Sequence, residues 1–261
     1  MERPIDLLRP VIEQLREAGL NHWGIVSREV YDSVASPGLT SADLAPWAKS
    51  ILVLASGGRA LWDDMCEAIL EDKRRLTRTP HPVDCHVGEI VQGVPLSMVR
   101  HRWFMATATA EVQLDFRSLA VLGGIGSPSR LGLVIDRQFG PWMGLRAACF
   151  LEWELPPSRP APDVCEGCSA PCVSACPAGA LPDGQWDVGV CAAYHRTSKD
   201  CDQTCHARVA CPVGEAHRYS DLEQIYHYDR ARGRVLLREA LGVDAADDPH
   251  QGIGPHWEAW D

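Results

Sequence analysis

Cysteine is the residue type most able to do chemistry in this chain, because eight of its eleven cysteines lie between residues 165 and 211. Thiolates are soft ligands, and a cubane [4Fe-4S] cluster takes four of them. Eight thiolates therefore meet the needs of two [4Fe-4S] clusters. The predicted metal ligands are Cys165, Cys168, Cys172, Cys176, Cys191, Cys201, Cys205 and Cys211.

Two of these cysteines, Cys176 and Cys211, directly precede a proline. In two-cluster ferredoxins the cysteine before the proline ligates the other cluster, not the one held by the rest of its own run. The array thus predicts a crossed division into two sets of four. The first set is Cys165, Cys168, Cys172 and Cys211, and the second set is Cys176, Cys191, Cys201 and Cys205.

The spacing departs from the bacterial C-x2-C-x2-C-x3-C-P form by one extra residue between Cys168 and Cys172, and by longer gaps on both sides of Cys205. Two alternatives stay open at this point: one cluster with leftover or zinc-bound thiols, and zinc alone, which also takes four sulfur ligands. A disulfide framework is disfavoured, because the cytoplasm keeps thiols reduced.

The net charge of −10 gives a surface that repels phosphate backbones, so no nucleic-acid partner is expected. The first residues lack an apolar core for a signal peptide, and no window approaches the roughly 20 apolar residues of a membrane span. We therefore expect a cytoplasmic protein without a membrane partner. The sequence is silent on oligomeric state.

The chain divides at the proline-rich segment 156–163, since closely spaced prolines disfavour helix and indicate an extended connector. Before it, helical and strand-like patterns alternate, which is typical of an α/β (α+β) domain. After it come the cysteine array and a final helical segment. The predicted parts are a domain at 1–155, a linker at 156–163, a two-cluster module at 164–219, and a C-terminal helix and tail at 220–261.

Hydrophobic periodicity predicts the elements that position these parts. Ser220 and Glu223 form a capping box that should begin a helix reaching about Leu241. Helices are expected at 4–18, 60–78, 83–93 and 98–121, and strands at 22–27, 50–56, 130–137 and 145–155.

A glycine segment in the first domain is the candidate ligand contact, because Gly123, Gly124 and Gly126 carry no side chain to hold a flat ligand away. The segment is not a Rossmann fingerprint, since a strand and not a helix is expected after it. Trp142 follows Gly140 and could cover a planar cofactor, with a core position as the alternative.

These features together resemble those of a known group of proteins. The order Gly123-Gly-Ile-Gly126, Phe139-Gly-Pro-Trp142, a strand ending in Leu155-Pro-Pro157 and the cysteine array resembles that of the cobalamin-dependent iron-sulfur reductases, namely epoxyqueuosine reductase and the reductive dehalogenases. His81-Pro-Val-Asp84 and Leu145-Arg146 are similar to segments of the cobalamin-processing CblC-type (MMACHC) proteins.

The resemblance implies a nitroreductase-like first domain that holds a corrinoid base-off, and a ferredoxin-like module that passes electrons to its cobalt. The protein would then act in cobalamin reduction or processing, or as a cobalamin-dependent reductase, with a ferredoxin, flavodoxin or reductase as electron donor. A ferredoxin-like carrier without its own substrate and a flavin-binding iron-sulfur reductase are the alternatives. The implied cofactor contacts are Gly123, Gly124, Gly126, Phe139, Gly140, Trp142 and Arg146.

The resemblance leaves the catalytic residues unassigned. Epoxyqueuosine reductases carry an aspartate proton donor upstream of the glycine motif, and an ungapped alignment places Ala110 at that position. Glu111 and Asp115 are the nearest carboxylates.

Overall fold

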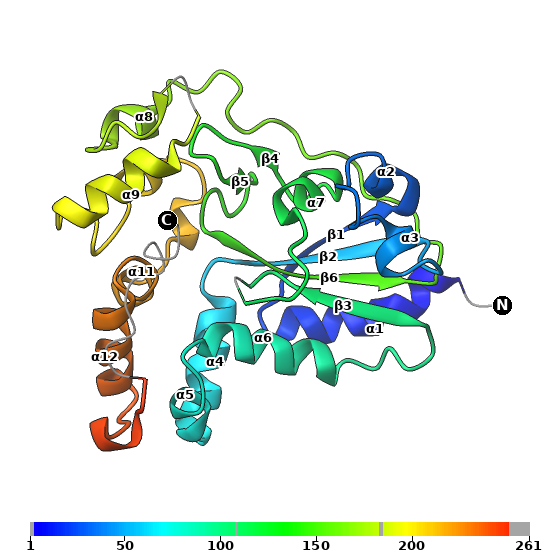
Figure 1. The fold of residues 1–261 in the computed structure, drawn as a ribbon, viewed down its shortest axis with the longest axis horizontal. Coiled ribbons are helices and arrows are strands. Elements are labelled where there is room, and N and C mark those ends of the chain that lie inside the picture. Colours follow the sequence, from blue (N-terminus) through cyan, green and yellow to red (C-terminus); the bar gives the residue numbers. More distant parts are fainter. Residues whose placement is uncertain (1–2, 108, 183–184, 251–261) are drawn as a thin grey trace.

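The structure is a computed structural model that describes residues 3–107, 109–182 and 185–250. Its centre is a four-stranded sheet in the order β1-β2-β6-β3, in which all neighbours are antiparallel (Figure 1). The strands are β1 (His22–Ser27), β2 (Ser50–Gly57), β6 (Met143–Leu151) and β3 (His101–Met105).

Strand β2 lies inside the sheet, and all eight of its residues are buried. Its side chains alternate between two hydrophobic cores: Leu52 and Leu54 enter one, and Ile51, Val53 and Ala55 enter the other. Helices cover both faces, so the expected mixed α/β class is confirmed. One core includes α1 (Pro4–Glu17), α4 (Ala60–Glu71) and α6 (Pro82–Gly93), and the other includes α2 (Arg28–Asp32), residues flanking α3 (Ser41–Leu44), and α7 (Phe116–Leu122).

Two sequence predictions fail between the helices and β6. The helix expected over 98–121 is instead strand β3, a connecting segment and α7, because Trp103 packs toward one core and Phe104 toward the other. Pairing with β6 completes that strand. The strand expected over 130–137 shrinks to β5 (Val134–Ile135), which among the described residues pairs with β4 (Ser127–Pro128).

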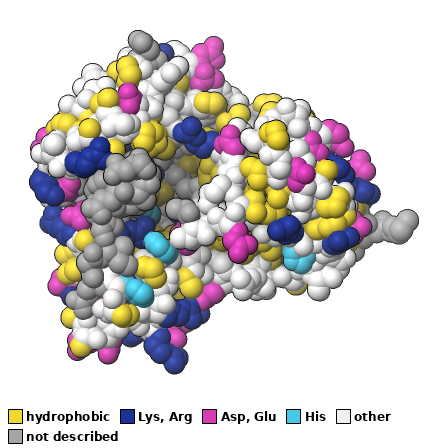
Figure 2. Space-filling view, viewed as in Figure 1, with side chains coloured by type: hydrophobic (Ala, Val, Ile, Leu, Met, Phe, Trp, Pro, Cys, Tyr) yellow, Lys and Arg dark blue, Asp and Glu magenta, His cyan; other side chains and the backbone are white. Residues whose placement is uncertain are grey.

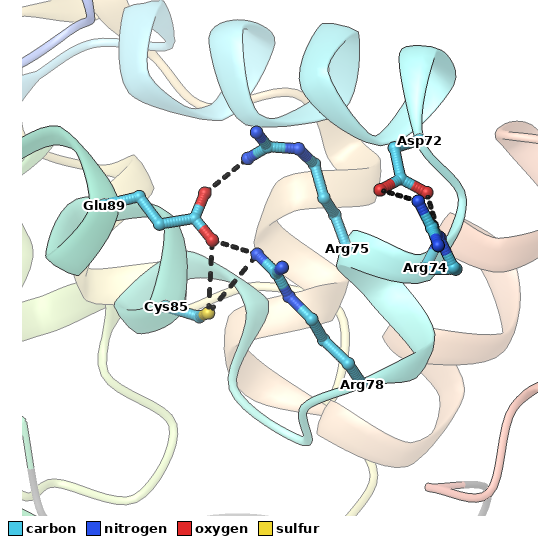
Figure 3. A network of polar contacts seen from close by, with 6 residues as sticks. All are labelled: Asp72, Arg74, Arg75, Arg78, Cys85 and Glu89. Carbon is cyan, nitrogen blue, oxygen red and sulfur yellow. Dashed lines mark hydrogen bonds and ion pairs between the residues drawn. The ribbon is translucent and has the colours of Figure 1, made fainter. Parts of the chain in front are cut away.

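A short helix, α5 (Arg74–Thr77), joins α4 to α6 through a network of charges (Figure 3). Glu89 of α6 accepts from both Arg75 and Arg78, and the Cys85 thiol lies beside Glu89 at 3.9 Å. Arg74 pairs with Asp72 at 2.9 Å. The three arginines of this region, Arg74, Arg75 and Arg78, are therefore paired with neighbouring carboxylates.

The proline-rich segment forms no helix, and its Ser158 lies beside β1. Ser158 donates from its backbone N to the Ile25 carbonyl at 2.9 Å and accepts from the Ile25 N with its hydroxyl, also at 2.9 Å. The segment thereby covers the edge of the sheet at β1.

The cysteine region is poor in regular structure and has its own small core around Leu131, Leu181 and Ala207. Its helices are α8 (Pro171–Ala175), α9 (Val188–Thr197) and α10 (His206–Val209), followed by the 3-10 turn η2 (Glu215–His217).

The capping box begins a helix as predicted, since the Ser220 hydroxyl accepts from the Glu223 N at 3.2 Å. The helix does not continue to Leu241. It divides into α11 (Asp221–Tyr228) and α12 (Arg230–Ala240), because Asp229 leaves the helical conformation and its side chain caps α12.

The C-terminal helices return to the first domain, where Tyr226, Leu237 and Leu241 join the core beneath the sheet. Beyond the turn η3 (Ala245–Asp247), the buried Asp248 pairs with Arg234. Residues 251–261 of the predicted tail fall outside the described part. In that part, no helix has the length and apolar character to span a membrane.

Candidate functional site

A cavity of about 510 Å³ lies between the sheet and the cysteine region. In Figure 2 the molecule is hollowed between these two halves. One wall carries Met143, Gly144 and Arg146 from the start of β6, with His81 and Asp84 at the start of α6. The opposite wall carries all four cysteines of the second set, Cys176, Cys191, Cys201 and Cys205.

The first set surrounds a different, much smaller space. Cys165, Cys168, Cys172 and Cys211 line a cavity of about 20 Å³, together with Pro171 and Arg130. The folded chain thus gathers the eight cysteines around two separate cavities in the same two sets of four as the crossed pairing. Whether each set binds a cluster stays a prediction.

The cysteines within a set affect one another electrostatically. Burial raises the pKa of Cys201 to about 12, and Cys205, Cys191 and Cys176 add to the effect. Burial likewise raises the pKa of Cys172, with further contributions from Cys211 and Cys165. In each of these cases the neighbouring thiols belong to the same set.

Each set is therefore costly to ionise by itself, because several like charges would meet in a partly desolvated space. A bound cationic centre removes this penalty, since metal ions deprotonate the thiols that ligate them. All eleven cysteines are free thiols. Among the described residues, no three Cys, His, Asp or Glu side chains form a group that could hold one metal ion.

The three glycines predicted to contact the cofactor, Gly123, Gly124 and Gly126, lie outside the wall of the large cavity. A Cβ on Gly124 would lie 2.0 Å from the Arg159 carbonyl oxygen, and one on Gly126 would lie 2.4 Å from the Ile135 carbonyl oxygen. A Cβ on Gly24 of β1 would lie 1.9 Å from the Gly123 carbonyl oxygen. The space beside these glycines is filled by the chain's own backbone, and none of Gly123, Gly124 and Gly126 lines the large cavity.

The Phe139–Trp142 segment is a contact between the two halves of the molecule. A Cβ on Gly140 would lie 2.1 Å from the Val213 carbonyl oxygen, just beyond the cysteine array. Phe139 is buried and packs edge-on against His217, with ring centroids 4.8 Å apart. Trp142 is fully buried against Tyr219, as the core alternative anticipated. The two ring residues and Gly140 do not line the cavity either.

Of the predicted first-domain contacts, Arg146 alone lies in the cavity wall. Its Nε donates to the buried Ser56 hydroxyl at 2.8 Å, which fixes the guanidinium near the sheet. Gly144 makes room for it, since a Cβ there would lie 2.6 Å from an Arg146 nitrogen. The aim of the Arg146 side chain is thus set by its neighbours on β2 and β6.

Two carboxyl groups with perturbed pKa values lie near Arg146, and sequence reasoning assigned neither of them to the candidate site. Burial raises the pKa of the cavity-lining Asp84, against the opposing charges of Arg146 and Arg230. Burial also raises the pKa of Glu223 to about 8. Glu223 is 3% exposed, and its Oε2 has no hydrogen-bond partner among the described residues.

The carboxylates nearest to Ala110 lie outside the large cavity. Asp115 caps α7, accepting from the Ser118 N at 3.0 Å. Glu111 lines a second cavity of about 460 Å³, which shares His81, Asp84 and Thr109 with the large one. The acidic group best placed between the two cavities is therefore Asp84.

Comparison with known proteins identifies the fold. No protein-family model matches the chain, and no curated protein does. Solved structures do. An epoxyqueuosine reductase determined with a tRNA-Tyr epoxyqueuosine-modified stem loop is 18% identical over 85% of this chain and 68% of that chain, with a TM-score of 0.56.

The epoxyqueuosine reductase of Streptococcus thermophilus is 14% identical over 93% of this chain and 81% of that chain, with a TM-score of 0.54. The C. elegans B12-trafficking protein CblC, a homologue of human MMACHC, is 10% identical over 92% of this chain and 98% of that chain, with a TM-score of 0.57. The predicted likeness to these two kinds of protein is confirmed at the level of the fold.

Proposed function

We propose that the chain is an iron-sulfur redox protein that passes electrons from two [4Fe-4S] clusters to a corrinoid bound in the large cavity. The observation that carries the proposal is the composition of that cavity, in which four cysteines face Arg146, Asp84 and His81. A relay that ends at a ligand site needs such an arrangement, because the last electron carrier must lie beside the acceptor.

The thiol groups fit the clusters. Each set of four surrounds its own cavity, and each is costly to ionise without a cationic centre. Zinc binding by three or four of these thiols would require them to approach one ion, and no such group occurs among the described residues. A cubane places its four cysteines on four different irons, so it suits thiols arranged around a space.

The cavity has a ligand-binding size, since small-molecule sites range from about 300 to 1,000 Å³. The second cluster would occupy the part beside the cysteines. A corrinoid would supply a cobalt centre that accepts these electrons and can react with a substrate or leave as cargo. Arg146 and Arg230 offer charged hydrogen-bond donors to polar groups at its rim, and Met143 offers an apolar surface.

The fold adds support, because the similar structures include a B12-trafficking protein and epoxyqueuosine reductases. One of these similar structures contains a tRNA stem loop, so a tRNA substrate is a second candidate for this chain. The ferredoxin-like character of the module at 164–219 is part of the proposal.

An anaerobic optical titration tests the corrinoid part. Purified protein is mixed with hydroxocobalamin, and the spectrum should change to that of a base-off corrinoid. Ala178→Trp, which fills the cavity wall, should abolish the change, whereas the exposed Ala246→Trp should not. Iron content must be equal in the three proteins.

An unchanged spectrum in the wild type would contradict the corrinoid proposal. Binding of a flavin under the same conditions would then favour the flavin-dependent reductase. Binding of neither would favour a simple electron carrier.

A further inference from the structure

Arg208 lies in the wall of the large cavity beside the second set of cysteines. Cys205 is the N-cap of α10, and Arg208 follows within the same short helix. The guanidinium donates from Nε to the Pro141 carbonyl at 2.9 Å and from Nη2 to the same oxygen at 2.5 Å. It lies over two rings that contact each other, 4.8 Å from the Trp142 centroid and 4.7 Å from the Tyr219 centroid.

The charge of this guanidinium is poorly neutralised by the protein. Among the described residues, no carboxylate forms an ion pair with Arg208 within 4.0 Å. The carboxyl group that its charge does reach is Glu223, which burial keeps largely protonated at neutral pH. Aromatic rings, the Pro141 carbonyl and the Tyr228 hydroxyl, which accepts from Arg208 Nη1 at 3.5 Å, hold the cation without cancelling its charge.

Arg208 lies beside one set of cysteines and not the other. It lines the cavity that the second set surrounds, and it is not part of the lining of the cavity that the first set surrounds. The cation beside the first set is Arg130, which is exposed, so that solvent and salt screen it.

Resting on the proposed function, we propose that Arg208 raises the reduction potential of the cluster held by Cys176, Cys191, Cys201 and Cys205 above that of the other cluster. Each cluster accepts one electron from a low-potential donor, and reduction adds one negative charge to its site. A fixed positive charge nearby favours that added charge, and net charge and hydrogen bonding are known to set such potentials. Electrons that enter at the first set would therefore collect beside the cavity.

The alternative is a purely mechanical role, because the two bonds to Pro141 also attach α10 to the first domain. Two substitutions separate the roles. Arg208→Gln removes the charge and keeps an amide donor. Arg208→Lys keeps the charge and loses the paired hydrogen bonds from Nε and Nη2 to the Pro141 carbonyl. Arg130→Gln is the matched control, since it removes an exposed charge from beside the first set.

The test is an anaerobic redox titration with dithionite, followed by low-temperature EPR. Cys201→Ser and Cys172→Ser assign the two signals to the second and first sets. Arg208→Gln should lower the potential of the second-set signal alone, Arg208→Lys should stay near the wild type, and Arg130→Gln should shift neither signal comparably. Equal shifts in the Gln and Lys variants, or equal shifts of both signals, would overturn the proposal.

A second measurement compares the potentials of the two clusters in the wild-type protein, so it does not depend on whether the Arg208 variants fold. In the wild type, the second-set signal should have the higher potential, and the gap should persist when the salt concentration is raised, because a partly desolvated charge is weakly screened. A second-set potential below the first-set potential would refute the inference. Protein without iron or inorganic sulfide would instead refute the proposed function.

Discussion

Gly140 and Gly214 pack backbone against backbone, where the first domain meets the segment after the last cysteine. A Cβ on Gly140 would lie 2.1 Å from the Val213 carbonyl oxygen, and one on Gly214 would lie 2.1 Å from the Phe139 carbonyl oxygen. Both residues have positive φ, 56° and 74°. This contact fixes how closely the two walls of the large cavity approach each other.

Gly140→Ala should therefore destabilise the protein more than its backbone strain alone explains. Gly38 has a φ of 84° and open space around it, so Gly38→Ala costs only the left-handed conformation, about 1 to 2 kcal/mol. Gly140→Ala adds overpacking, worth about 1 to 3 kcal/mol. Thermal unfolding of the two variants measures the difference, and equal midpoints would contradict the close contact.

Glu223 predicts a pH dependence of stability. Its pKa in the folded protein, about 8, lies above the ordinary 4.5, so the folded state binds a proton that the unfolded chain releases between these values. Stability therefore falls as pH rises through this window, by up to about 1.4 kcal/mol per pH unit from this group.

Glu223→Gln should flatten that decline, because the amide stays neutral at every pH. Urea unfolding at several pH values between about 5 and 8 compares the slopes. Asp221→Asn, on an exposed residue of the same helix, should keep the wild-type slope. A Glu223→Gln protein with that same slope would show that the carboxyl is already ionised.

The ion pair between Arg234 and Asp248 should stabilise the packing of the segment around Asp248 against α12. Two hydrogen bonds of 2.8 Å join these side chains, which are 3% and 1% exposed. Asp248→Asn leaves a buried guanidinium without its counter-charge and should cost about 3 to 5 kcal/mol. Asp247→Asn, the exposed neighbouring change, should cost almost nothing. Equal unfolding free energies for the two variants would rule out this anchoring role.

The grouping of the cysteines and the start of the C-terminal helix could be predicted from the sequence. The prolines after Cys176 and Cys211 indicated which cysteines group together, because that rule reflects the local geometry of a cysteine run. The Ser220 cap is also local, and the helix start followed from it. Strand β3 was missed because Trp103 and Phe104 become a strand only through pairing with β6, which lies about forty residues later in the chain.

The role of the glycine segment at 123–126 could not be predicted from the sequence. Glycines permit a close approach without naming the partner, and at Gly124 the partner is the backbone of Arg159. Arg208 and Glu223 were missed for a related reason, since nothing in the sequence says which rings or charges will surround them. The position of Arg208 three residues after Cys205 was the one available signal.

Single cysteine substitutions should affect the two sets independently. Cys172→Ser should remove one EPR signal and Cys201→Ser the other, each with about half of the iron lost, because each cysteine ligates one cluster. Cys66→Ser is the control, since that half-buried thiol has its pKa raised to about 12 by burial and lies outside both sets. Loss of both signals in either variant would argue against separate sites.

The most direct test of the account is the iron and acid-labile sulfide content of anaerobically purified protein, with low-temperature EPR after reduction. We predict about eight irons and eight sulfides per chain, and the signals of two reduced cubane clusters. Zinc in place of iron, or the absence of inorganic sulfide, would contradict the redox function and the corrinoid proposal with it.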